Sequence, residues 1–190
     1  MTRIRIFLLG AAFALLTPAQ SQAQEWTLLI RNGTIVDGTG APGYIGDVAV
    51  VGDRIVAVSR TSLDRTRARR VVDATGLVIA PGFIDLHAHI EPLLQMPDSK
   101  SAVTQGVTLA LGGPDGSGPW PLASYLDSAA KSGLGMNVAY LVGHNTIRRT
   151  VMGTENRAPT PAELQRMIAL IRRGMGEGAF GISTGRRYVP

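Results

Sequence analysis

The sequence contains no cysteine among its 190 residues. Disulfide bonds, thiolate nucleophiles and cysteine-based zinc fingers are therefore excluded, and any metal site must use histidine and carboxylate ligands. Lysine occurs only at Lys100 and Lys131, so arginine supplies nearly all of the net charge of +5. The arginines are scattered, apart from a group within residues 65–70, and no nucleic-acid motif accompanies them. We therefore expect no nucleic-acid partner.

The sequence has no apolar run long enough to span a bilayer. Its N-terminus carries Arg3 and Arg5, followed by a short apolar stretch over residues 6–16 and small residues at Ser21 and Ala23. This order is typical of a signal peptide with its cleavage site, and an uncleaved anchor is the alternative. We predict a signal peptide over residues 1–23 and a periplasmic or secreted protein without a stable membrane anchor.

Residues 24–79 have the pattern of many short strands separated by turn residues. Arg31-Asn32-Gly33 is typical of a hairpin turn, and Gly52-Asp53 of a second one. Short strands at this spacing predict a small β-sandwich segment, with a half-barrel as the alternative, and the pattern changes near residues 79–82.

From residue 80 onward, strand-like and helix-like segments alternate. One helix start is well marked, because Thr160 is a suitable N-cap, Pro161 takes the first helical position and Glu163 completes a capping box. Alternating units of this kind indicate parallel α/β architecture. Four strands are predicted, at residues 83–87, 107–111, 137–142 and 180–183. The fold class is therefore α/β, with residues 80–190 as the first half of a TIM-like (β/α)8 barrel.

Two histidines stand at the end of the first barrel strand. His87 and His89 are two residues apart, and such residues lie on the same side of a strand. Neutral imidazole is a preferred zinc ligand, and the carboxyl ends of the strands form the active face of a barrel. The pair is therefore predicted to bind a metal. Asp85 shares its face and is expected to orient one of the ligands.

These motifs together resemble the amidohydrolase superfamily, and within it the N-acyl-D-amino-acid deacylases. The superfamily resemblance rests on residues 30–38 and on Pro81-Gly82-Phe83-Ile84-Asp85-Leu86-His87-Ala88-His89. The resemblance to the branch rests on residues 104–108, 137–144, 148–153 and 178–190. It implies a metal-dependent hydrolase that cleaves the linear amide bond of an N-acyl-D-amino acid with water activated by one or two Zn²⁺ ions.

The resemblance also implies further site residues. The branch often carries a metal-binding cysteine in Asn-Cys-Gly, where this chain has Asp115 in Gly113-Pro114-Asp115-Gly116. Asp115 is therefore expected to be a ligand, with an ordinary turn residue as the alternative. Tyr188 matches a tyrosine that in the branch contacts the substrate carbonyl, with a packed loop tyrosine as the alternative. His144 is a second candidate for substrate binding, or else it braces its loop.

Some parts of the family's machinery have no counterpart in the sequence. The fourth strand carries no lysine, which argues against a carboxylated-lysine site. The general acid–base aspartate and further histidine ligands are expected beyond Pro190, so the barrel is predicted to be incomplete and the chain alone inactive. A cyclic-amide hydrolase of the hydantoinase or dihydroorotase type and a non-catalytic periplasmic metal-binding module are the alternatives.

Overall fold

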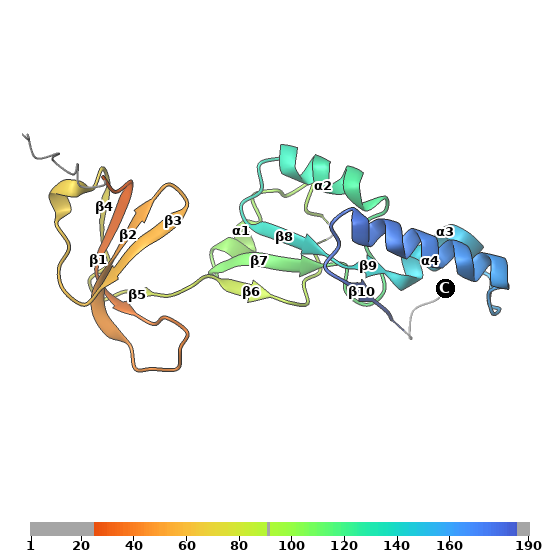
Figure 1. Cartoon of the computed structure of the whole chain (residues 1–190), viewed down its shortest axis with the longest axis horizontal. Coiled ribbons are helices and arrows are strands. Elements are labelled where there is room, and N and C mark those ends of the chain that lie inside the picture. Colours follow the sequence, from red (N-terminus) through yellow and green to blue (C-terminus); the bar gives the residue numbers. More distant parts are fainter. Residues whose placement is uncertain (1–24, 91, 186–190) are drawn as a thin grey trace, which may run out of the picture. The chain divides into compact units, whose positions relative to one another are not determined.

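The computed structural model of the protein describes residues 25–90 and 92–185, so the predicted signal peptide and Tyr188 lie outside its described part. The chain divides into two compact units between Ala80 and Pro81, and Figure 1 shows a sheet in the first and strands with helices in the second. Among the described helices, none combines the length and the apolar character that crossing a membrane requires.

The first unit is built on one five-stranded sheet. Its strand order is β3-β2-β1-β4, with β5 also paired to β1. Neighbours β1, β2 and β3 are antiparallel, whereas β4 and β5 run parallel to β1. Leu29, Ala49 and Trp26 form its buried core. The elements are β1 (Leu28–Ile35), β2 (Tyr44–Val51), β3 (Arg54–Ser59), the 3-10 helix η1 (Arg65–Arg67), β4 (Val71–Asp73) and β5 (Val78–Ile79).

The hairpin predicted at Arg31-Asn32-Gly33 is wrong, because β1 continues through these residues with an irregularity in its register. Asn32 takes a left-handed φ of 61°. The carboxylate of buried Asp47 accepts the Asn32 backbone N–H at 2.9 Å, which supports this conformation within the strand. The second predicted turn, at Gly52-Asp53, does join β2 to β3.

The second unit alternates parallel strands with helices, which confirms the α/β class. Strands β6, β7 and β8 form one parallel sheet, and β9 pairs in parallel with β10. Within the described residues these strands form no closed barrel. The elements are β6 (Phe83–Asp85), α1 (Lys100–Val103), β7 (Val107–Gly112), α2 (Leu122–Lys131), β8 (Asn137–Tyr140), β9 (Val142–Gly143), α3 (His144–Met152), α4 (Pro161–Gly176) and β10 (Ile182–Ser183).

The capping box predicted at the start of α4 is confirmed, because both of its hydrogen bonds are present. The Thr160 hydroxyl accepts the Glu163 backbone N–H at 3.3 Å, and the Glu163 carboxylate accepts the Thr160 N–H at 2.8 Å. Apolar side chains of α3 and α4, among them Ile147 and Met167, pack with Val142 of β9 in one buried cluster. This packing holds the N-terminus of α3 close to the carboxyl ends of the strands.

Candidate metal centre

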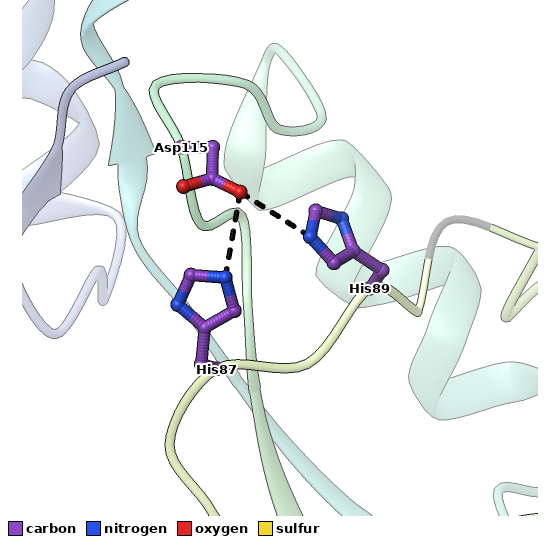
Figure 2. Close-up of side chains that lie close together, drawn as sticks. All are labelled: His87, His89 and Asp115. Atoms are coloured by element: carbon purple, nitrogen blue, oxygen red, sulfur yellow. Dashed lines mark ion pairs between the residues drawn. The ribbon is translucent and has the colours of Figure 1, made fainter.

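The two neighbouring histidines lie in the loop that follows β6. The strand ends at Asp85, earlier than the sequence predicts, and the Asp85 carboxylate accepts the His87 backbone N–H at 3.0 Å. Between the histidines, Ala88 is buried and donates its backbone N–H to the carbonyl of Leu111 at 3.1 Å. The loop is thus held against β7, and both imidazoles extend toward the connection that follows β7 (Figure 2).

Asp115 meets the two imidazoles from that second connection (Figure 2). Its Oδ2 atom lies 3.4 Å from His87 Nε2 and 3.3 Å from His89 Nε2. The two rings are inclined by 67°, with their centroids 5.5 Å apart. One ligand atom from each of the three residues lies within 4.8 Å of the others, so the structure brings the three predicted ligands together.

These separations fit a shared metal ion. Zinc bonds of about 2.0–2.1 Å in a tetrahedral site place any two ligand atoms about 3.3–3.4 Å apart. The two measured nitrogen–oxygen distances, 3.4 and 3.3 Å, agree with that separation. Two imidazole nitrogens and a carboxylate oxygen are also donors that zinc accepts in proteins. Each imidazole therefore lies at the distance from Asp115 that two ligands of one cation would have, and all three ligand atoms lie within 4.8 Å of one another.

The candidate ligands are accessible to ions in solution. The side chains of His87 and His89 are 64% and 61% exposed, and that of Asp115 is 33% exposed. With neutral imidazoles the group carries one negative charge, which attracts a cation. Asp115 is the least exposed of the three because its turn is packed against β10 and α3.

The other predicted site residues are placed differently. Asp85 contacts the backbone of His87, so it shapes the loop through the main chain. His144 opens α3 and lies outside the three-residue group, with its Nδ1 atom 3.5 Å from the Thr184 hydroxyl. Tyr188 is not among the described residues.

Two residues that sequence reasoning missed contact the turn that carries Asp115. The Ser183 hydroxyl, on β10, donates to the carbonyl of Gly113 at 2.6 Å and accepts the N–H of Gly116 at 3.0 Å. The backbone N–H of Asn145, at the start of α3, donates to the carbonyl of Gly116 at 2.8 Å. Ser183 lies 67 and 70 positions from its two partners, and no local sequence pattern signals so distant a contact.

Comparison with known proteins finds a family match and similar relatives. The amidohydrolase family matches residues 70–189. D-aminoacylase of Alcaligenes xylosoxydans xylosoxydans is 37% identical over 196 residues, which cover 90% of this chain and 40% of the relative. This chain therefore spans about two fifths of the length of that curated relative.

Two solved structures share the fold. A D-aminoacylase described as having a binuclear metal centre has a TM-score of 0.78 at 37% identity, over 86% of this chain and 39% of the other. N-acyl-D-glutamate deacylase from Bordetella bronchiseptica has a TM-score of 0.81 at 33% identity, over 87% of this chain and 40% of the other. That protein was solved with zinc and a phosphonate that mimics the tetrahedral intermediate of its reaction.

Proposed function

This chain belongs to the amidohydrolase family, and on that premise we propose that it forms part of an enzyme that deacylates N-acyl-D-amino acids. The observation that carries the proposal is the convergence of His87, His89 and Asp115 within 4.8 Å. D-aminoacylase and N-acyl-D-glutamate deacylase, to which the chain is similar over nearly its whole length, support this substrate class.

The proposed cofactor is zinc, as one ion or two. His87 and His89 would bind through Nε2 and Asp115 through Oδ2, the atoms whose separations fit a single ion. When bound, such an ion supplies a water nucleophile at neutral pH and polarises the amide carbonyl for attack. Because the ligand set contains a carboxylate in place of a thiolate, its donor atoms are harder in the Lewis-base sense. The site should therefore have a weaker preference for soft metal ions than a thiolate site has.

The chain's own residues hold this group in place. Asp85 accepts the backbone N–H of His87, and the buried Ala88 donates its backbone N–H to Leu111 of β7, so the loop between the two rings is anchored to the sheet. His144 and Tyr188 are proposed to contact the substrate. The general acid–base aspartate is proposed to come from outside these 190 residues, so we expect the 190-residue chain to bind metal without turnover.

The first test of the proposal is metal binding by the purified chain. Isothermal titration with Zn²⁺ should show saturable binding, and Asp115→Ala and His89→Ala should each weaken it strongly. Asp127→Ala is the matched control, because Asp127 lies on α2, outside the three-residue group. Equal zinc affinity in all four proteins would overturn the proposed metal site.

The second test is hydrolysis of matched N-acetyl-D- and N-acetyl-L-amino acids. It should be run on the 190-residue chain and on any longer product of its gene. We expect D-selective release of acetate only from a product that adds the missing acid–base group. Hydrolysis of a cyclic amide in place of these substrates would support the hydantoinase-type alternative.

Export to the periplasm or the medium remains part of the proposal. It rests on the sequence pattern of residues 1–23, which the structure does not describe. N-terminal sequencing of the protein recovered from a periplasmic extract should begin at Gln24. A product in the cytosol that retains Met1 would contradict this part.

A further inference from the structure

The turn that carries Asp115 has an unusual backbone. In residues 113–116, which we call the Asp115 turn, Gly113, Asp115 and Gly116 all have positive φ angles, of 73°, 58° and 81°. The left-handed region costs an ordinary side chain about 1–2 kcal/mol, although aspartate tolerates it better than most. Hydrogen bonds from other parts of the second unit are therefore needed to hold the Asp115 turn in this conformation.

Ser183 ties the two ends of the Asp115 turn together. Its hydroxyl donates to the carbonyl of Gly113 at 2.6 Å and accepts the N–H of Gly116 at 3.0 Å. A single side chain thus satisfies one backbone acceptor and one backbone donor on either side of Asp115. Because β10 is a strand of the second unit, the turn is fixed to regular structure and not to another loop.

The N-terminus of α3 holds the same turn from a second direction. The carbonyl of Gly116 accepts the backbone N–H groups of Asn145 at 2.8 Å and Thr146 at 3.1 Å. The Asn145 side chain, in a residue only 5% exposed, donates from Nδ2 to the carbonyl of Gly185 at 3.1 Å. Asn145 therefore links the Asp115 turn to the segment that follows β10.

We propose that Ser183 and Asn145 are positioning residues of the metal site, which hold the Asp115 turn so that Oδ2 faces both imidazoles. The inference rests on the proposed metal function and extends it to residues that contact no ligand atom. The physical reason is preorganisation. Because the hydrogen bonds already hold the Asp115 turn in place, metal binding does not have to order the turn first.

The test compares matched variants of the purified chain. Ser183→Ala removes both hydrogen bonds to the turn, and Ser183→Thr keeps the hydroxyl. Ser128→Ala is the control, because among the described residues the Ser128 hydroxyl bonds within its own helix, to the carbonyl of Ser124 at 2.9 Å. Asp115→Ala reports separately on the proposed metal site.

Three readouts distinguish positioning from a merely structural role. Zinc affinity should fall by about 10- to 100-fold in Ser183→Ala, the usual effect of removing a residue that orients a metal ligand, and stay close to that of the parent in Ser183→Thr and Ser128→Ala. In the metal-free protein, amide exchange should accelerate at Gly116 in Ser183→Ala. The absorption spectrum of bound Co²⁺ should also change in Ser183→Ala, and stay that of the parent in Ser183→Thr and Ser128→Ala.

Each result decides a different claim. If Asp115→Ala weakens zinc binding and folded Ser183→Ala does not, the positioning inference is overturned and the metal site stands. If neither variant changes zinc binding, the proposed function fails first, and unchanged exchange at Gly116 would also refute the positioning role. Should Ser183→Ala fail to fold by circular dichroism, Ser183→Val takes its place with the same expected results, because valine has the shape of threonine without the hydroxyl that bonds the turn.

Discussion

Replacing Gly116 by alanine tests directly how tightly the Asp115 turn is held. Gly116 has a φ of +81°, and an added Cβ would lie 2.7 Å from the backbone nitrogen of Gly185 and 2.8 Å from the amide group of Asn145. The left-handed backbone costs alanine about 1–2 kcal/mol, and overpacking adds about 1–3 kcal/mol. We expect Gly116→Ala to lower the free energy of unfolding by about 2–5 kcal/mol.

Gly133→Ala is the matched control for the cost of placing alanine in the left-handed backbone region. Gly133 has a similar φ of +73°, but apart from its chain neighbours no described residue has an atom within 4 Å of the position that an added Cβ would take, so Gly133→Ala should cost only about 1–2 kcal/mol. Urea unfolding of both variants gives the difference, which isolates the crowding around Gly116. Zinc affinity should fall in Gly116→Ala and stay unchanged in Gly133→Ala. Equal losses of stability, or unchanged zinc affinity in Gly116→Ala, would refute this account of the turn.

Three further predictions concern stability. Ile147→Ala should cost about 2–5 kcal/mol because its side chain is fully buried, whereas Leu164→Ala, 46% exposed, should cost far less in the same urea titration. Asp47→Ala should destabilise by about 2–4 kcal/mol, and more than Asp47→Asn, because it leaves two backbone N–H groups without their acceptor. The hydrogen bonds from Arg157 hold the pKa of Glu163 well below its ordinary value of 4.5. The stability that this interaction contributes is fully present above pH 4.5 and is lost as the pH falls below it. Unfolding midpoints measured from pH 6 to pH 3 should therefore decline less steeply in Glu163→Gln than in the parent protein. An equal slope in the two proteins would contradict this prediction.

The features that were predicted correctly from the sequence depend on neighbouring residues. The start of α4 follows from Thr160, Pro161 and Glu163, because a capping box is complete within four positions. The side chains of His87 and His89 lie close together, as was expected, but they extend from a loop, so the strand on which that expectation rested ends before them. Local patterns of this kind hold because tertiary packing does not oppose them.

The features that the sequence did not reveal depend on distant partners. The irregularity at Asn32 is supported by a carboxylate 15 positions away, so the same residues that are typical of a hairpin remain inside a strand. The contacts of Ser183 with the Asp115 turn span 67 and 70 positions. Asp115 itself was expected only through a family resemblance, because Pro-Asp-Gly is equally typical of an ordinary turn.

The placement of the proposed ligands on two successive connections would make a shared ion a reversible cross-link. His87 follows β6 and Asp115 follows β7, so an ion shared between them would close the intervening stretch of chain, α1 included, into a ring. An ion that binds only the folded chain at a free concentration of about 100 times its dissociation constant stabilises it by about 2.7 kcal/mol. The melting temperature would then track metal supply, and a chelator would act on this protein as a mild denaturant.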